Sequence, residues 1–193
     1  MDRETALVDA ALVCIARVGL AKTTLDDVAR QDGCARATVY RTFSSKADLI
    51  KGVVAREAGR LEQDVLTAAQ NADSLADAAT AAITTAAALV QSHQALAFVA
   101  AYEPELLLPH LAFEHEDFVL RSAATLVAPA FERFLPADRA ERLGEWIARI
   151  TLSYLCCPSD DFDLCNAEHV RALVEDFVLP GFVRPVKAEG VTR

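Results

Sequence analysis

The chain has 193 residues, of which 53% are apolar and 24% charged, and its formal net charge is −9. This length can hold a small module and a larger one, and seven glycines and seven prolines leave little room for low-complexity linkers. We find no apolar run long enough to span a bilayer and no basic start followed by an apolar segment. We therefore expect a cytoplasmic protein that is neither inserted in a membrane nor secreted.

Alanine-rich runs and the scarcity of alternating β-branched residues predict an all-α protein. The first predicted helix places its apolar residues on a single face, namely Leu7, Ala11, Cys14, Ile15 and Val18. Core packing then explains Cys14 without any special chemistry.

Two short helical patterns joined by a glycine occupy residues 23–46. The first starts at Thr23-Thr24, which can cap a helix through a side-chain oxygen, and it buries Leu25, Val28 and Ala29. Gly33 suits the left-handed backbone that ends a helix, and the second pattern runs from about Ala35 to Phe43. This arrangement is typical of a helix-turn-helix, which places its second helix in the DNA major groove.

The second pattern has an apolar root and a polar outer side. At 100° per residue, Val39 and Phe43 point inward, toward the first pattern. The remaining side chains point outward or lie along the edges, and Arg36 reaches outward from the first turn: Arg36, Ala37, Thr38, Tyr40, Arg41 and Thr42. Such a surface suits a DNA groove, and the alternative is an ordinary amphipathic helix with a solvated face.

The run from Gly33 to Phe43, with Thr38-x-Tyr40 inside it and Lys46 after it, resembles the DNA-binding domain of tetracycline-repressor (TetR) type regulators. The likeness covers roughly residues 5–55, where the motif follows an N-terminal helix and precedes a long helical remainder. It implies DNA contacts from the residues that match the family positions: Thr24, Arg36, Ala37, Thr38, Tyr40, Arg41, Thr42 and Lys46.

Each of these side chains has suitable chemistry. Thr24 at a helix start can offer its hydroxyl and nearby N–H groups to a phosphate, and Tyr40 and Lys46 can grip the backbone. Arg36 and Arg41 are candidates for bidentate contact with guanine, which contributes about 1–3 kcal/mol of discrimination.

The remaining positions include two departures from the family pattern. Ala37 and the methyl group of Thr38 can meet a thymine methyl. Ala35 stands where the family usually has a Ser-like cap, and Thr42 replaces a larger aromatic or imidazole side chain. Both departures make the operator sequence harder to predict.

The negative charge is concentrated outside this module. Residues 1–60 hold ten Lys or Arg and eight Asp or Glu, a net of +2, so residues 61–193 carry −11 of the total of −9. A local basic footprint predicts moderate, strongly salt-dependent DNA binding.

The rest of the chain reads as further helices. We predict a long helix over Lys46–Gln70, an Ala/Thr-rich helix that follows a cap at Ser74 and runs to about Gln91, a third over Gln94–Tyr102 and a fourth over roughly Phe113–Phe134. The family resemblance assigns residues 1–46 to an N-terminal three-helix DNA-binding domain and residues 47–193 to a C-terminal helical domain for ligand binding and dimerisation.

Two final helices are predicted over Asp138–Cys156 and Ala167–Leu179, the second of them ended by Pro180-Gly181. Members of the family dimerise through two such helices and their copies, and a single helix-turn-helix rarely contacts enough DNA. We predict a homodimer interface with Trp146, Ile150, Tyr154, Val170, Val174 and Phe177. The alternative is that both apolar stripes only fill the core of one chain.

The middle helices are the predicted site of a small-molecule effector. Aromatic side chains there can line an apolar cavity, and we predict ligand contacts from Phe98, Tyr102, Phe113, Phe118, Trp146 and Tyr154. His93, His110 and His115 are polar groups that can orient a ligand. A helical core needs aromatic residues in any case, so each of these residues has core packing as its alternative role.

Other site chemistry is less favoured. His110 and His115 lie near Glu114, Glu116 and Asp117, but solvated acidic surface explains them better than a metal site, so we expect no metal and no cofactor. Buried thiols explain Cys156, Cys157 and Cys165 better than a redox switch.

These observations favour a nucleoid-associated, homodimeric repressor that a small, mostly apolar ligand releases from a palindromic double-stranded DNA operator. An effector-independent regulator or an activator is the first alternative. A helical protein-binding adaptor with a decayed DNA surface is another. No set of nucleophile, oriented base and oxyanion donor is recognisable, so we do not expect an enzyme.

Overall fold

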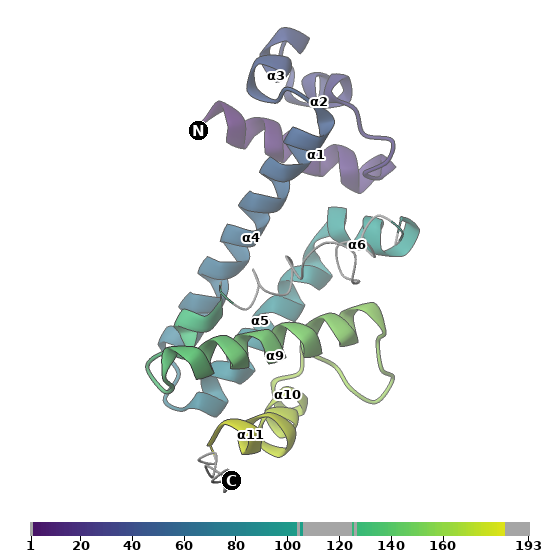
Figure 1. The fold of residues 1–193 in the computed structure, drawn as a ribbon. Helices are drawn as coiled ribbons and strands as arrows, with labels where there is room; N and C mark the ends of the chain where they lie inside the picture. Colours follow the sequence, from purple (N-terminus) through teal and green to yellow (C-terminus); the bar gives the residue numbers. More distant parts are fainter. Residues whose placement is uncertain (1, 104, 106–124, 126, 184–193) are drawn as a thin grey trace, which may run out of the picture. The chain divides into compact units, whose positions relative to one another are not determined.

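The computed structural model describes residues 2–103, 105, 125 and 127–183, and over these residues it is helical, with no strand (Figure 1). The helices are α1 Arg3–Val18, α2 Leu25–Asp32, α3 Arg36–Thr42, α4 Lys46–Gln70, α5 Leu75–Ser92, α6 Gln94–Tyr102, α9 Ala137–Cys156, α10 Ala167–Leu173 and α11 Leu179–Val183. The all-α prediction is confirmed.

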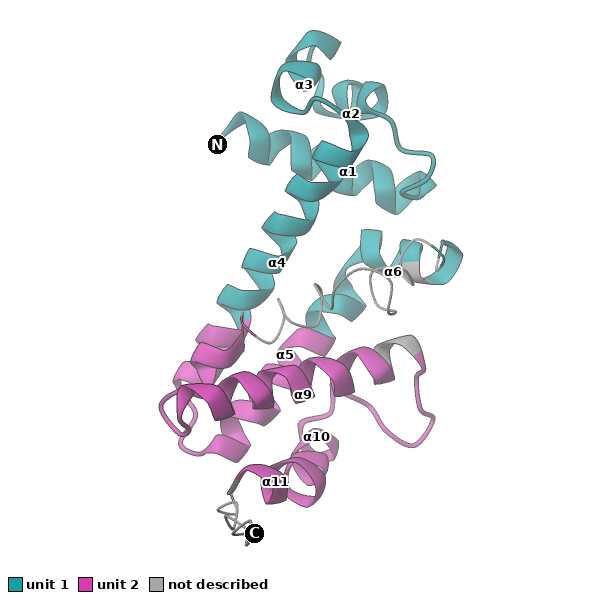
Figure 2. Cartoon of the chain, viewed as in Figure 1, with its two compact units in different colours: residues 1–64, 88–122 teal, residues 65–87, 123–193 magenta. Residues whose placement is uncertain are grey.

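The chain forms two compact units, coloured separately in Figure 2. Unit 1 comprises residues 1–64 and 88–122, and unit 2 comprises residues 65–87 and 123–193. Both α4 and α5 begin in one unit and end in the other. The predicted division at residue 46 separates a DNA-binding part from a regulatory part, and it stays a prediction.

The hydrophobic core of the N-terminal helices includes the inner side of α3, the second helix of the helix-turn-helix. Buried side chains from α1, α2, α3 and the start of α4 form one cluster: Leu7, Val8, Ala10, Ala11, Leu25, Val28, Ala29, Val39, Phe43, Leu49 and Val53. Cys14 and Ile15 are also buried as predicted, whereas Val18 in the last turn of α1 is 43% exposed. Burial of this apolar face holds α3, which has only seven residues, in place.

Local sequence signals set the ends of these helices. Thr24 begins α2 with a capping box: its hydroxyl accepts the N–H of Asp27, and the Asp27 carboxylate accepts the N–H of Thr24. Gly33 ends α2 in the left-handed region at φ +76°, as predicted. Ala35 precedes α3 without a side-chain cap, which also agrees with the sequence.

The predicted bounds of α4 and α6 are confirmed, and those of α5 and α9 differ by one residue at an end. His93 caps α6, because its Nδ1 accepts the N–H of Leu96. In unit 2, the core contains Ile83 of α5, Phe131, Leu143 of α9 and the fully buried Val170 and Val174.

Two predicted helix ends are wrong. Most of the predicted helix over Phe113–Phe134 lies outside the described residues, but its described end is a short 3-10 turn over Ala128–Ala130 followed by turns through Phe134. Pro129 lies in this turn and has no N–H to donate to an α-helical bond.

The last helix does not stop at Pro180-Gly181, because α11 runs through both residues to Val183. The backbone between α10 and α11 widens into a π-helical turn over Val174–Val178, in which the N–H of Leu179 reaches the carbonyl of Val174. An α-helical turn before Pro180 would press the proline ring against the carbonyl four residues earlier, and the wider turn relieves that clash.

Several chemical predictions concern residues only partly covered by the structure. His110 and His115, with the acidic residues around them, lie outside the described residues, and the described part of the chain has no group of three or more His, Cys, Asp or Glu arranged to hold a metal. Cys14 is buried and Cys34 is half-buried. Cys157 and Cys165 are exposed free thiols, so the prediction of buried thiols is wrong for these two. Among the described helices, none is sufficiently long and apolar to cross a membrane.

Candidate nucleic-acid interface

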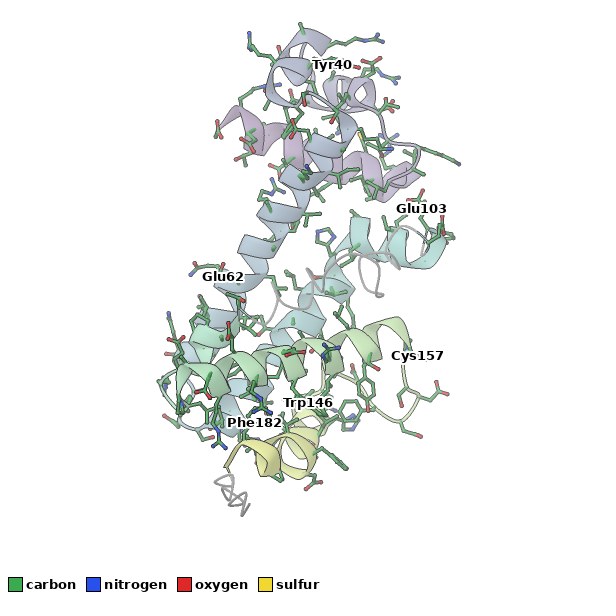
Figure 3. The ribbon with its side chains drawn as sticks, in the orientation of Figure 1. Tyr40, Glu62, Glu103, Trp146, Cys157 and Phe182 are labelled. Atoms are coloured by element: carbon green, nitrogen blue, oxygen red, sulfur yellow. The ribbon has the colours of Figure 1, made fainter. Side chains whose placement is uncertain are left out.

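The α3 helix combines a buried root with an exposed outer side. Val39 is fully buried and Phe43 is 4% exposed, whereas Tyr40 is 53% exposed and can be seen on α3 in Figure 3. Arg36, Ala37 and Arg41 are also exposed, and Thr38 and Thr42 are half-buried. The structure thus brings all six predicted α3 contact residues onto one short helix.

The two arginines of α3 differ in their surroundings. Arg36 forms an ion pair with Asp26 in the first turn of α2, at 3.0 Å between Nη1 and Oδ2. Arg41 has no ion pair with any residue that the structure describes. Sequence reasoning did not find Asp26, because only the packing of α2 against α3 brings its carboxylate to Arg36.

Threonine hydroxyls near α3 are partly engaged within the protein. The Thr24 hydroxyl donates to Asp27 Oδ2, so its hydrogen belongs to the α2 cap. The pKa of Asp27 lies below its ordinary value, chiefly because its carboxylate accepts the hydroxyl and the N–H of Thr24. The Thr42 hydroxyl donates to the carbonyl of Thr38, 3.1 Å away. A phosphate only accepts hydrogen bonds, so at these positions it would need the free backbone N–H groups at the start of α2, or a hydroxyl hydrogen released from its present acceptor.

Lys46 connects the start of α4 to the turn between α1 and α2. Its Nζ donates to the carbonyl of Ala21 at 2.7 Å, and the ammonium has two further hydrogens for a phosphate. Ala21 is also held at its N–H side by Glu103, whose carboxylate accepts the N–H groups of Leu20 at 2.6 Å and Ala21 at 3.1 Å.

Glu103 is thus a positioning residue that sequence analysis missed. It ends α6, it is 8% exposed, and it lies 82 residues from Ala21 in the chain. An acid directly after an apolar helix is the signal that could have drawn attention to it. Gly19 makes the approach possible, since an added Cβ would lie 2.5 Å from Oε1 of Glu103.

A second polar group in unit 1 joins α1, α4 and α6. Arg56 forms ion pairs with Asp9 and Glu57, and the Nε2 of His93 lies 3.2 Å from the other Glu57 oxygen. The neighbouring surface pocket of about 260 Å³ has both apolar and polar walls, including Leu12, Leu89, Glu57, Arg60 and His93.

The predicted effector residues fall in separate places. The rings of Phe98 and Tyr102 pack at a tilt in unit 1 with their centroids 4.8 Å apart, and Tyr102 is largely exposed. The rings of Tyr154 and Phe162 pack at a tilt in unit 2, with centroids 4.7 Å apart. Phe113 and Phe118 lie outside the described residues. The effector contacts of all these residues stay predictions.

The predicted interface residues divide into exposed and buried ones. Trp146 is 50% exposed and Phe177 is 74% exposed, while Ile150 and Tyr154 are half-buried. Val170 and Val174 have no exposed surface, so they pack within the core of the single chain. Core packing accounts for their burial, and their part in a dimer interface stays a prediction.

Comparison with known proteins agrees with this arrangement. Residues 7–53 match the family described as bacterial regulatory proteins, tetR family. The uncharacterized HTH-type transcriptional regulator Rv1255c of Mycobacterium tuberculosis is 30% identical over 168 residues, which are 85% of this chain and 77% of that protein.

Two solved structures have a similar fold at low sequence identity. The TetR family repressor AlkX from Dietzia sp. strain DQ12-45-1b is 17% identical, with a TM-score of 0.68 over 92% of this chain and 95% of that one. FadR of Bacillus subtilis is 16% identical, with a TM-score of 0.58 over 88% of this chain and 96% of that one. The chain therefore belongs to the TetR family of DNA-binding transcriptional regulators.

Proposed function

We propose that this regulator is a homodimeric repressor that a small, mostly apolar ligand releases from a palindromic operator. The observation that carries the proposal is α3, on which Arg36, Tyr40 and Arg41 project from a helix fixed by the buried Val39. Two such helices related by two-fold symmetry read half-sites about one helical turn apart.

Exposed aromatic side chains support the dimer. Trp146 of α9 and Phe177 of the π-helical turn are large apolar groups on the surface of unit 2. An isologous interface would remove both from water in each of the two copies.

Structural neighbours favour a ligand with a long apolar part. AlkX is implicated in the biodegradation of n-alkanes, and FadR of Bacillus subtilis was solved in complex with stearoyl-CoA. The aromatic residues predicted to contact the ligand suit a molecule of the same character.

Binding of the full-length protein to DNA from its own gene neighbourhood tests the first half of the proposal. We expect tight binding that resists unrelated competitor DNA, that weakens steeply with salt, and that Tyr40→Ala abolishes. Tyr102→Ala is the matched control, because it removes another exposed tyrosine, outside α3. Binding that competitor removes equally well from every duplex, with no effect of Tyr40→Ala, would contradict sequence-specific regulation and favour a protein-binding adaptor.

Isothermal titration with fatty acyl-CoA and with free fatty acid tests the second half. A ligand that releases DNA must bind more weakly to the operator complex than to the free protein, because the coupling between the two sites is reciprocal. Equal affinity with and without operator would exclude such coupling for that ligand.

A further inference from the structure

Arg36 in the first turn of α3 has an ion-pair partner, and Arg41 in the last turn has none among the described residues. Arg36 lies 3.0 Å from Asp26, and the two side chains are 70% and 31% exposed. The pair therefore lies at the surface of the helix-turn-helix, where the α2 and α3 first turns meet. Arg41, one turn further along α3, is exposed and has no ion pair among the described residues.

Within the described structure, the ion pair with Arg36 is the only polar contact of the Asp26 side chain. The neighbouring Asp27 completes the α2 cap with Thr24 and also pairs with Arg30. The side chain of Asp26 bonds to neither, and its second oxygen, Oδ1, is buried without a hydrogen-bond donor. An enclosed acceptor without a donor is unfavourable, and a guanidinium presents several N–H groups in a fork. Arg36 can therefore supply the donor that Oδ1 lacks while staying on the same carboxylate.

We propose that Asp26 is a positioning residue for base recognition: it holds the Arg36 guanidinium so that its remaining N–H groups address one base pair of each half-site. The inference rests on the proposed operator binding. On this proposal the protein fixes the orientation of the Arg36 side chain before DNA binds, whereas Arg41 takes up its orientation only on contact with DNA.

The charge of Asp26 favours this role over simple attraction to DNA. A carboxylate beside the DNA-facing helix repels phosphates, so it weakens binding to every sequence alike. A surface ion pair of this exposure also contributes little to folding stability. What the pair can supply is order, since an arginine held in one geometry loses less conformational freedom when it meets a guanine.

Selection from a random duplex library with the full-length protein tests the proposal. The wild-type protein is expected to enrich a palindromic sequence, and R36A identifies the base pair that depends on Arg36. D26N is then expected to reduce discrimination at that base pair by about tenfold, within the range that a bidentate arginine–guanine contact supports. Its affinity for random-sequence DNA should stay equal or rise, since one negative charge is lost.

Three further variants separate positioning from general effects. D26E should retain discrimination, because it keeps the carboxylate. D32N is the matched control: it removes an acid from the other end of α2 and breaks the ion pair with Arg3, and it should leave discrimination at that base pair unchanged. In the R36A background, D26N should cause no additional loss at that base pair.

Contrary outcomes are equally distinct. Unchanged discrimination in D26N, an equal loss on every duplex, or the same relaxation in D32N would each overturn the role of Asp26 and leave operator binding intact. A wild-type protein that enriches no sequence would overturn the proposed function itself, and the inference with it.

Discussion

The threonine at the start of α2 shows how one side chain organises the helix-turn-helix. Thr24 both accepts from and donates to Asp27, and it keeps the pKa of that carboxyl below its ordinary value. A carboxylate with a lowered pKa stabilises the folded state at neutral pH, and this contribution disappears as the pH falls through the folded-state pKa. We therefore expect this cap to contribute to the loss of stability of the folded protein in acid.

Replacement of Thr24 by alanine tests the cap. We expect Thr24→Ala to lower the free energy of unfolding by about 1 kcal/mol at neutral pH, because the N–H of Asp27 loses its acceptor. The variant should also lose less stability than the wild type when the pH is lowered below the ordinary carboxyl range. Urea titrations at several pH values measure both effects, and Thr24→Ser, which keeps the hydroxyl, should behave like the wild type. Parallel pH profiles for Thr24→Ala and the wild type would contradict this account.

At the scale of whole helices, two glycines with positive φ end α1 and α2, but their backbones and surroundings differ. Gly33 is left-handed at φ +76° and ψ +22°, whereas Gly19, at φ +88° and ψ +165°, lies outside the left-handed helical region. A Cβ on Gly33 would meet nothing within 4 Å, whereas a Cβ on Gly19 would meet Glu103 at 2.5 Å and the Phe98 ring at 2.8 Å. Glycine is required at position 33 only for its backbone conformation, whereas at position 19 it is also required because there is no room for a side chain.

Alanine at each glycine separates these demands. Gly33→Ala should cost about 1 kcal/mol, the usual penalty for a side chain in left-handed backbone. Gly19→Ala should cost clearly more, since the side chains of α6 must also move. Thermal unfolding of the two variants under identical conditions compares them, and equal losses would show that the close approach of Glu103 is not maintained in solution.

Glu103 itself ties the end of α6 to the turn after α1. Glu103→Ala removes the acceptor of two N–H groups, and we expect a loss of about 1–3 kcal/mol together with faster hydrogen exchange at Leu20 and Ala21. Glu105→Ala is the matched control, because Glu105 is exposed and only two residues away. Unchanged exchange at both amides in Glu103→Ala would contradict the predicted link.

The same scale shows what the sequence could predict. Periodicity and turn residues located α2, α3, α4 and α6, because these helices begin or end at local signals such as Thr24 and Gly33. Pro180 misled the prediction, since a local rule cannot anticipate the wider turn that precedes it. The contacts of Asp26 and Glu103 depend on how helices cross, which no pattern within one helix reveals.

At the scale of the whole molecule, the proposed dimer would rest on a few exposed aromatic groups. Phe177 and Trp146 are exposed, whereas Val170 and Val174 are fully buried. Charge adds a second constraint, because residues 61–193 carry −11 and two copies repel each other at low salt. Apolar contact must outweigh that repulsion in a dimer.

Phe177→Asp is the sharpest test of assembly. It places a charge where we expect apolar contact between copies, and it should convert a dimer into a monomer and weaken operator binding by more than tenfold. Sedimentation velocity measures the change. Glu175→Gln, on the same turn, is the control and should remain dimeric. A Phe177→Asp protein that sediments as a dimer would place the interface elsewhere.

The cysteines differ in exposure, so the rates at which they react with an alkylating reagent report on different parts of the protein. Cys157 and Cys165 are open to alkylating reagents, Cys34 is half-buried beside the helix-turn-helix core, and burial raises the pKa of the Cys14 thiol. If the protein is alkylated for increasing times and its peptides are analysed by mass spectrometry, we expect Cys157 and Cys165 to be modified first. Cys14 should be modified last, because its modification requires the three-helix core to open. Operator DNA that selectively slows labelling of Cys34 and Cys14 would report occupancy of α3 without any introduced probe.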